Sequence, residues 1–193
     1  MGYALAAAAA ARGWDVELVS GPVQLDPPKG VKVENVVTGE EMYHSVREKF
    51  ADCDILIMTA AIMDYRPKSV ADHKIKKFKL EMVIEMEPVI DVLASVSKSK
   101  TTQVIVGFAA ETDHIEDYAR KKLLSKNADF IVANQIGGKE SAFESDNNRV
   151  LVLTRKGEKL SLGPLQKSIL SDHLLDLFEP LVESARIPVS STT

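Results

Sequence analysis

Three lysines fall within four residues at Lys74-Ile75-Lys76-Lys77, in a polar stretch of the chain. Cations placed so close together in a loop could clamp a polyphosphate and neutralise the charge that develops during phosphoryl or nucleotidyl transfer. A solvated lysine-rich loop produces the same pattern and is the commoner origin of such runs. The lysine run alone therefore leaves a phosphate site and an ordinary surface loop both open.

A second candidate site lies where the apolar run at residues 54–61 ends. Ala60 and Ala61 are small enough to let a ligand approach the backbone closely, and Asp64 offers a carboxylate that could hold a magnesium ion. Small residues at strand ends also serve packing, and a single loop aspartate is often a helix cap or a turn former. These residues indicate a site edge but do not by themselves establish a ligand.

The segment Gly107-Phe108-Ala109-Ala110-Glu111-Thr112 follows the next apolar run and precedes a helical pattern. Backbone amides at such a junction could face a ligand at the helix N-terminus. Phe108 could stack on a base, although a place in the core is commoner for such a side chain. On the predicted helix, Tyr118, Lys122 and Lys126 recur at four-residue spacing and so share one face, which could bind phosphates or be a solvated surface.

Other polar residues carry weaker signals. Asn134 follows a short apolar run and could hydrogen-bond a ligand, as could the loop Ser145-Asp146-Asn147-Asn148-Arg149, for which turn formation is the easier explanation. The four histidines are scattered without the spacing of metal ligands. Cys53 is the only cysteine, which excludes disulfide frameworks and multi-cysteine zinc sites, and we expect it to be a packing residue.

Apolar runs that alternate with helical patterns must position these residues. Thr38 and Glu41 form a predicted capping box that opens a helix. The alternation predicts an α/β fold, with a Rossmann-like, doubly wound and mostly parallel sheet, an appended C-terminal β-hairpin, and ligands beyond the carboxyl ends of the strands. Buried strands are predicted at residues 54–61, 103–108 and 128–133, other strands at 15–19, 31–36 and 80–85, hairpin strands at 149–154 and 158–162, and helices at 2–12, 38–50, 88–97, 111–126 and 165–178.

The composition bounds the class of protein. Of 193 residues, 45% are hydrophobic and 27% are charged, so one domain is expected over residues 1–180, followed by a tail at 181–193. A net charge of -4 offers no field for nucleic acid or an anionic membrane. The alanine run at residues 4–11 lacks the basic flank of a signal peptide, and no apolar stretch reaches the roughly 18 residues of a membrane span. We therefore expect a cytoplasmic protein.

Taken in order, several of these segments point to one protein family, although each alone is unspecific. They are Met1-Gly2-Tyr3-Ala4-Leu5-Ala6, Leu18-Val19-Ser20-Gly21-Pro22, Ala60-Ala61 with Asp64-Tyr65-Arg66-Pro67, Lys74-Ile75-Lys76-Lys77, residues 107–112, Lys126-Asn127, Ile131-Val132-Ala133-Asn134 and Ser145-Asp146-Asn147-Asn148. Over residues 1–178 the chain resembles the phosphopantothenoylcysteine synthetase family, known in most bacteria as the second half of a bifunctional coenzyme A enzyme.

The resemblance implies a Rossmann-like homodimer that joins 4'-phosphopantothenate to L-cysteine. CTP, with Mg²⁺, would activate the carboxylate of phosphopantothenate as an acyl-cytidylate and release pyrophosphate, and the cysteine amine would then displace CMP. Lys74 would be the catalytic lysine, Ala60 and Ala61 would contact phosphopantothenate, and Asp64 would hold the metal. A flavin-dependent phosphopantothenoylcysteine decarboxylase would be fused to the domain or associate with it. The residues implied in nucleotide binding are Met58, Thr59, Ala60, Asp64, Phe108, Lys122 and Lys126.

Two departures from the family pattern accompany the resemblance. The family's first strand, glycine-rich turn and asparagine-containing loop precede the segment that matches Met1-Gly2, so we expect this chain to lack them. Glu87-Pro88-Val89-Ile90 stands where the family usually has Asn-Pro-Asp-Ile beside the nucleotide. These departures motivate an alternative, a catalytically inactive nucleotide-binding or assembly module of the same fold. A nicotinamide-dependent oxidoreductase is disfavoured because no Gly-x-Gly-x-x-Gly follows a first strand.

Overall fold

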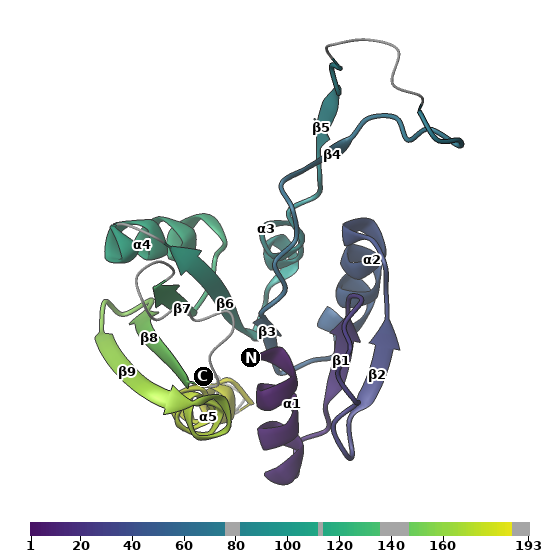
Figure 1. Ribbon diagram of the computed structural model, residues 1–193. Coiled ribbons are helices and arrows are strands. Elements are labelled where there is room, and N and C mark those ends of the chain that lie inside the picture. The colour runs from purple at the N-terminus through teal and green to yellow at the C-terminus, as the bar shows by residue number, and fades with distance from the viewer. Residues whose placement is uncertain (76–81, 112–113, 136–146, 187–193) are drawn as a thin grey trace, which may run out of the picture.

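Strands and helices alternate along the chain and assemble around a five-stranded sheet (Figure 1). The computed structural model describes residues 1–75, 82–111, 114–135 and 147–186. The predicted α/β class, mostly parallel sheet and appended hairpin are confirmed. In the sheet, β3 (Ile55–Met58), β6 (Val104–Glu111) and β7 (Phe130–Gln135) run parallel, and β8 (Asn147–Thr154) and β9 (Lys159–Gln166) extend it as an antiparallel hairpin.

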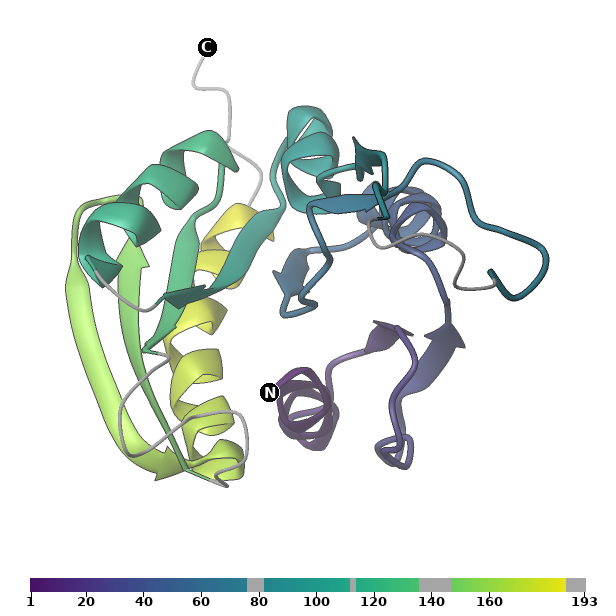
Figure 2. The same cartoon turned by 45° about the horizontal axis from the view of Figure 1, so that its top comes forward.

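Helices cover both faces of this sheet. Figure 2 shows the long α5 running along one face, where it also packs against α1. The opposite face is covered by three shorter helices and a 3-10 turn. The first face thus carries α1 (Gly2–Ala11) and α5 (Lys167–Arg186), and the second carries α2 (Gly39–Phe50), α3 (Val92–Val96), η1 (Ser97–Ser99) and α4 (Ile115–Ser125).

The central strands supply buried side chains to both faces. In β6, Ile105 packs in the core formed with α2, α3 and α4, whereas Val106, the next residue, packs in the core formed with α1 and α5. The same alternation in β7 places Ile131 in the first core and Val132 in the second. A nearly continuous apolar run is the pattern of a strand that is covered on both faces, and the sequence predicted these strands on that ground.

The ends of α1 and α2 also follow the sequence signals. Thr38 Oγ1 accepts a hydrogen bond from the Glu41 N–H at 3.1 Å, and the Glu41 carboxylate accepts one from the Thr38 N–H at 3.3 Å. This reciprocal capping box satisfies backbone donors that a helix leaves unpaired at its start. After α1, Gly13 adopts a φ of 83°, a left-handed conformation that glycine accepts without strain, and the chain turns toward the next strand.

The parallel strands are divided between two sheets. β1 (Glu17–Ser20) and β2 (Lys32–Asn35) form a two-stranded parallel pair. Within the described residues, this pair and the five-stranded sheet share no hydrogen-bonded strands. The α1 helix leads into β1, and α2 follows β2 and packs against the five-stranded sheet. The two-stranded pair is thus flanked in the chain by α1 and α2, which cover opposite faces of the five-stranded sheet.

A narrow antiparallel ribbon projects from the layered body (Figures 1 and 2). It is formed by β4 (Tyr65–Pro67) and β5 (Met86–Pro88), and we use the term ribbon for these strands with residues 68–75 and 82–85. A strand was predicted at residues 80–85, of which residues 82–85 are described. The prediction is wrong for these residues, because the strand begins only at Met86. Pairing with the distant β4 fixes its position, and a local apolar pattern could not reveal that partner.

Several other element boundaries differ from prediction: β3 ends at Met58, α3 begins only at Val92, and β9 continues through Gln166. β6 continues through Glu111, paired with Gln135 of β7, so most of the segment expected as a strand-to-helix junction is strand and α4 begins only at Ile115. α5 continues past the predicted end at residue 178 to Arg186, with Pro180 inside it, because Val182 still packs in the core. Among the described helices, none is both long and apolar enough to cross a membrane.

Candidate functional site

The carboxyl ends of the three parallel strands meet at one edge of the five-stranded sheet. Met58, the last residue of β3, pairs with Gly107 of β6, which pairs with Ile131 of β7. β6 and β7 continue four residues beyond this level, to Glu111 and Gln135. Thr59 is half-buried just beyond β3, whereas Ala60 and Ala61 are exposed. In an open α/β sheet this edge is where ligands bind, so the predicted substrate-binding residues lie in the expected place.

The start of α1 reaches the same edge. A Cβ atom added to Gly2 would lie 2.6 Å from Thr59 Oγ1, which is closer than a carbon and an oxygen can approach. Glycine at this position therefore allows the first turn of α1 to contact the end of β3 directly. Backbone donors at the start of a helix attract anions, so the contact places a weakly positive helix end beside the candidate site.

Residues 107–111 form the last part of β6 and not the junction with a helix that the sequence predicted. A Cβ atom on Gly107 would meet Ile131 Cδ1 at 2.8 Å and Leu93 Cδ2 at 3.0 Å, so a larger residue would make these side chains shift. Phe108 is half-buried against the core formed with α1 and α5. Its ring is thus partly a core side chain, and the remainder is accessible beside the strand ends.

Asn134 lies near the end of β7, opposite Ala110 of β6. Strand alternation places its side chain on the face that Val132 shares with α1 and α5, the face on which Phe108 also packs. The buried Asn134 Oδ1 has no hydrogen-bond partner in the described part of the chain. A buried acceptor without a donor is costly, so Asn134 is a candidate ligand contact, as its position after an apolar run suggested.

Two predicted site residues, Asp64 and Lys126, are brought together by the fold. Lys126 caps the C-terminus of α4 and forms an ion pair with Asp91, the N-cap of α3, whose Oδ1 accepts a hydrogen bond from the Ala94 N–H at 3.0 Å. Partial burial lowers the pKa of Lys126, and the nearby charge of Asp64 opposes part of that shift. A cation therefore lies close to two carboxylates, from a loop and from a helix cap that sequence patterns had not singled out.

Lys122 and Tyr118 continue the predicted face of α4. Lys122 is half-buried one turn before Lys126, and Tyr118 is exposed, with Lys121 Nζ 5.5 Å from its ring centroid. The two predicted phosphate-binding lysines thus lie along one helix, and the charge of Asp64 acts on the pKa of Lys126. The four-residue spacing identified this face, but not the carboxylates that it meets.

Asp64 is the predicted metal ligand. Its side chain is exposed, and its backbone carbonyl accepts a hydrogen bond from the Val89 N–H at 2.8 Å, which ties the segment after β3 to residues 87–90. In the described residues no group of three or more metal-ligating side chains is present. A single carboxylate is compatible with Mg²⁺, which proteins commonly hold through one or two carboxylates and the phosphates of a substrate.

Lys74 lies on the ribbon and not at the sheet edge. Its side chain is exposed, on the segment that follows β4. Lys76 and Lys77 lie outside the described residues, as do Ser145 and Asp146 of the predicted polar loop. The lysine run therefore belongs to the projecting part of the molecule, and the structure does not bring Lys74 into contact with the strand ends.

Arg66 and Glu87 form a charged pair that sequence spacing could not identify. They lie opposite one another in β4 and β5, and Arg66 Nε donates to Glu87 Oε1 at 2.8 Å. Arg66 Nη1 also lies 3.3 Å from Glu40 Oε2, at the start of α2. The two carboxylates raise the pKa of Arg66, Glu87 contributing most. Glu87, the acidic departure from the family pattern, is thus paired with a cation.

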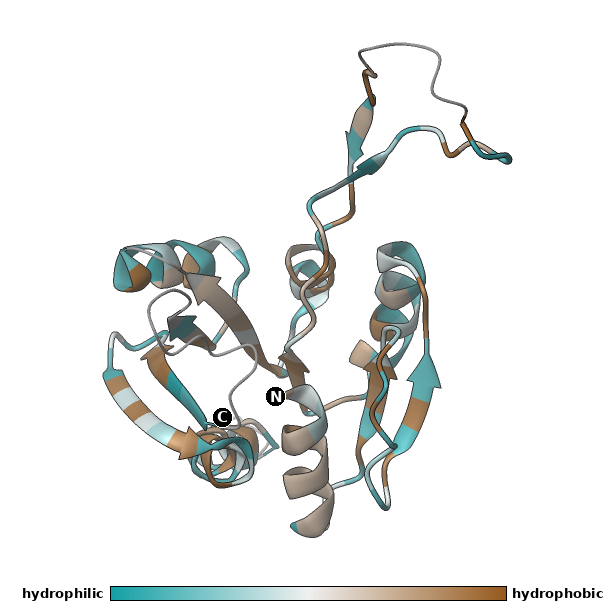
Figure 3. Cartoon of the chain, viewed as in Figure 1, coloured by the Kyte–Doolittle hydropathy of each residue, from teal (hydrophilic) through white to brown (hydrophobic). Residues whose placement is uncertain are grey.

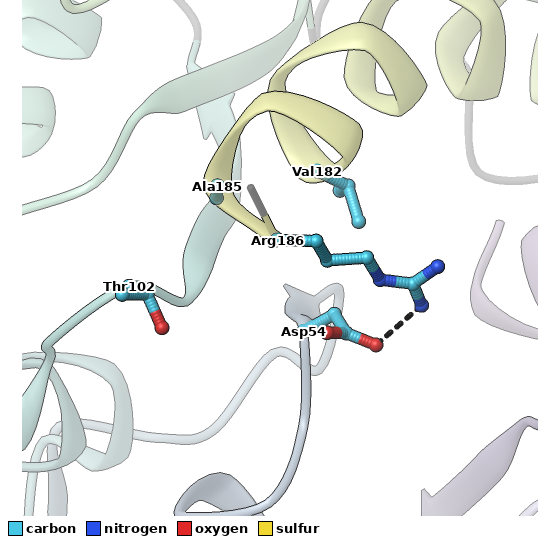
Figure 4. Close-up of a pocket in the computed structure, with 5 residues that line it drawn as sticks. All are labelled: Asp54, Thr102, Val182, Ala185 and Arg186. Carbon is cyan, nitrogen blue, oxygen red and sulfur yellow. Dashed lines mark hydrogen bonds and ion pairs between the residues drawn. The ribbon is translucent and has the colours of Figure 1, made fainter. Parts of the chain in front are cut away.

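Two further features lie away from this site. Asp54, Thr102, Val182, Ala185 and Arg186 line a pocket of about 290 Å³ near the amino end of β3, where Arg186 bonds Asp54 at 2.5 Å (Figure 4). It lies at the opposite edge of the sheet from the candidate site.

Burial, assisted by the charge of Asp54, raises the pKa of Cys53 to about 11, so its thiol is protonated at neutral pH. These properties agree with a packing role for Cys53.

Comparison with known proteins adds a family to this geometry. Residues 1–181 match the family model described as the DNA/pantothenate metabolism flavoprotein C-terminal domain. The chain is 43% identical over 176 residues to the coenzyme A biosynthesis bifunctional protein CoaBC of Bacillus subtilis, covering 91% of this chain and 43% of that protein. It is 43% identical over 181 residues to CoaBC of Escherichia coli K12, covering 91% of this chain and 44% of that one. The chain thus spans less than half the length of these relatives.

A solved structure agrees with the sequence comparison. The crystal structure of the C-terminal domain of coenzyme A biosynthesis bifunctional protein CoaBC matches with a TM-score of 0.80 and 37% sequence identity. The match covers 95% of this chain and 82% of that domain. The similarity therefore includes the sheet, both helical layers and the edge where the candidate residues gather.

Proposed function

We propose that this chain, which belongs to the family of the DNA/pantothenate metabolism flavoprotein C-terminal domain, is a synthetase that joins 4'-phosphopantothenate to L-cysteine in coenzyme A biosynthesis. The observation that carries the proposal is the family match over residues 1–181, supported by relatives named for coenzyme A biosynthesis. The predicted substrate-binding residues at the sheet edge are consistent with it. The product is 4'-phosphopantothenoylcysteine.

The reaction proceeds in two transfers. The carboxylate of phosphopantothenate attacks the α-phosphorus of CTP, forming the acyl-cytidylate as the bond to pyrophosphate breaks. The cysteine amine then attacks the acyl carbon, loses a proton as the amide bond forms, and CMP leaves with the electrons of the acyl–oxygen bond. The first step brings two anions together, so it requires positive charge at the reacting atoms.

The side chains of this chain divide that task. Ala60 and Ala61, exposed beyond β3, leave room for phosphopantothenate against the backbone. Lys122 and Lys126 on α4 bind nucleotide phosphates or the base, and the accessible part of Phe108 stacks on the base. Lys74 is the catalytic lysine that neutralises charge on the α-phosphate. Since Lys74 lies on the ribbon, this role requires the ribbon to carry it to the nucleotide of its own or a second subunit.

Met58, Thr59 and Asp64 complete the nucleotide site. Met58 ends β3 and Thr59 touches the start of α1, so the backbone here faces the region where phosphates would lie. We assign the metal to Asp64, which is exposed. Its carboxylate would hold Mg²⁺ together with the nucleotide's phosphates. The ion would supply additional neutralisation of the leaving pyrophosphate.

The homodimer implied by the resemblance has a candidate surface on the ribbon. Large apolar side chains are exposed along it, and Figure 3 shows their apolar character on the projecting part of the molecule. Apolar surface of this kind on a soluble chain marks an interaction site. The exposed side chains are Tyr65, Val70, Ile75, Met82, Val83, Ile84 and Met86. We place the contact between two copies there, and we expect a decarboxylase to accompany the synthetase, since the relatives are bifunctional.

The proposal is tested by pyrophosphate release from the full natural protein with CTP, Mg²⁺ and phosphopantothenate, with and without cysteine, and with ATP in place of CTP. Release that depends on phosphopantothenate and falls about 100-fold in Lys74→Ala supports the activation step and the role of Lys74. Lys29→Ala, which removes an exposed lysine from the connection between β1 and β2, is the matched control and leaves the rate unchanged. No release from folded protein that still binds CTP would favour the inactive nucleotide-binding module.

A further inference from the structure

We propose that Arg66 is a positioning residue, which fixes the direction in which the ribbon leaves the body and so presents Lys74 to the nucleotide. Only the role of Lys74 in this inference rests on the proposed function. The link between Arg66 and the two carboxylates stands on the described contacts. The charged residues on the ribbon strands, which the proposed chemistry does not use, thereby acquire a function.

A single guanidinium joins three elements. Arg66 belongs to β4, its Nε donates to Glu87 of β5 at 2.8 Å, and its Nη1 donates to Glu40 of α2 at 3.3 Å. Glu40 lies in the first turn of α2, a helix that is packed into the core through Met42, Val46 and other residues. Arginine is suited to such a bridge because its planar fork presents several donors in fixed directions. The ribbon is thus fastened across its width and to the body by the same side chain.

Close packing holds only part of the base of the ribbon, so the polar link through Arg66 can affect the ribbon's orientation. A Cβ atom on Gly39 would lie 3.0 Å from Ile62 and 3.1 Å from Val89, so both base segments touch the start of α2 closely there. Beside that contact, a pocket of about 300 Å³ separates the ribbon from α2, and Arg66 and Glu40 are among its lining residues. Side chains do not fill this space, so close packing does not hold the ribbon along it.

Charge explains why removal of Arg66 should alter orientation more than stability. Glu40, Arg66 and Glu87 are substantially exposed, and exposed ion pairs add little to global stability. Without the arginine, however, Glu40 and Glu87 would be two carboxylates without a counter-charge on facing segments and would repel each other weakly. A small energetic bias is enough to redistribute a ribbon between orientations. Glu87 lies two residues before Val89, whose N–H donates to the Asp64 carbonyl, so an unpaired Glu87 would add negative charge to the segment beside Asp64.

The test measures kcat, KM and melting temperature in the full natural protein. Arg66→Ala is expected to lower kcat for pyrophosphate release about tenfold, because Lys74 is misplaced, with the CTP dissociation constant and the melting temperature unchanged. Glu40→Gln gives a similar loss, and the double variant is no slower than Arg66→Ala, because both changes cut the same link. Arg66→Lys, a cation without the fork, recovers only part of the rate. Arg47→Ala, an exposed arginine on the same helix, is the control and retains full activity.

Amide hydrogen exchange supplies a readout that does not depend on catalysis. In Arg66→Ala, exchange is expected to accelerate at residues 65–75 and 82–88, while β6 and β7 exchange as in the wild type. Unchanged exchange in the ribbon overturns the inference, and so does a loss of rate that Glu40→Gln does not reproduce, since Arg66 would then act on the nucleotide directly. A wild-type protein that fails to turn over, but whose ribbon exchange responds as expected, refutes the proposed function and leaves the fastening role of Arg66 supported.

Discussion

The central strands of the five-stranded sheet bury their apolar side chains within this chain, whereas the ribbon exposes them. Ile105 in β6 and Val132 in β7 are 0% exposed, while Val70 is 84% and Val83 is 89% exposed. The sheet's sequence is therefore constrained by packing inside one chain. The ribbon buries little and gains little stability, so its sequence is free to serve contacts outside the body. One chain thus combines a region that sets stability with a region whose side chains are available to a partner or a ligand.

Among the changes that test this difference between the two regions, Phe178→Ala in α5 is expected to lower the free energy of unfolding most. Phe178 is fully buried, with its ring centroid 4.9 Å from that of Phe130, and its loss leaves a cavity between the helix and the sheet. We expect the free energy of unfolding to fall by about 3–5 kcal/mol in denaturant titrations. Ile169→Ala, at a 45% exposed position on the same helix, serves as the control and should cost less than about 1 kcal/mol. Equal losses in both variants would contradict the assignment of stability to the buried face.

Asp129→Asn is the next largest expected effect. The Asp129 carboxylate accepts hydrogen bonds from Lys100 Nζ at 2.5 Å and from the Ile105 N–H at 2.8 Å, and both charged side chains are only 14% exposed. Replacing it leaves a half-buried lysine without its counter-charge, and we expect a loss of about 2–4 kcal/mol in the same titrations. Asp172→Asn, which loosens an exposed pair with Arg12, should change stability by less than about 0.5 kcal/mol. A larger cost for Asp172→Asn would show that exposed pairs matter here.

Lys126 provides a test by pH at the boundary between the two regions. Burial lowers its pKa, so the ammonium that binds the nucleotide loses its proton at a lower pH than an ordinary lysine. CTP affinity should be constant near neutral pH, begin to fall as the pH approaches that lowered pKa, and be lower by about tenfold once the pH lies about one unit above it, because only the charged form attracts phosphate. Isothermal titration between pH 7 and about 10 measures the fall. In Lys126→Arg, which stays charged, CTP affinity should not change over this pH range. If affinity in this variant falls with pH as it does in the wild type, the effect belongs to another group.

The smallest effect on stability is expected from Val83→Ser in the ribbon. Val83 contacts mainly solvent in this chain, so the free energy of unfolding should change by less than about 0.5 kcal/mol at a protein concentration where the chain is monomeric. Sedimentation over a concentration series should show weaker self-association than in the wild type, since the ribbon is the proposed contact surface. Val106→Ser, at a buried position of β6, is the counterpart that should lose stability without this change in association. A large loss of stability in Val83→Ser would remove the contrast between the two regions.

The parts of the fold that sequence could predict are those encoded locally. β3, β6 and β7 are apolar runs because both faces are covered, and α2 starts at a capping box whose two residues are three apart. The ribbon strand could not be placed, because Met86–Pro88 is a strand only through its pairing with β4. The extension of α5 past Pro180 was likewise missed, because a proline usually signals a helix end and only the packing of Val182 shows otherwise.

The candidate site divides in the same way. Ala60, Ala61 and Asp64 could be placed at a site edge because they directly follow a buried strand, and Lys122 and Lys126 could be placed on one face by their spacing. The proximity of Lys126 to Asp64 and Asp91 could not be predicted, because three separate elements bring these groups together. Arg66 and Glu87 were also beyond reach, since cross-strand partners have no fixed separation in sequence.

The protonated thiol of Cys53 has a practical consequence for experiments on the ribbon. Its pKa of about 11 leaves almost no thiolate at neutral pH, and the chain contains no other cysteine. A cysteine introduced at an exposed ribbon position such as Val70 should therefore react with a maleimide dye long before Cys53 does. This chain thus offers a nearly silent background for fluorescent labelling, and energy transfer from a dye on the ribbon could follow the ribbon's movement.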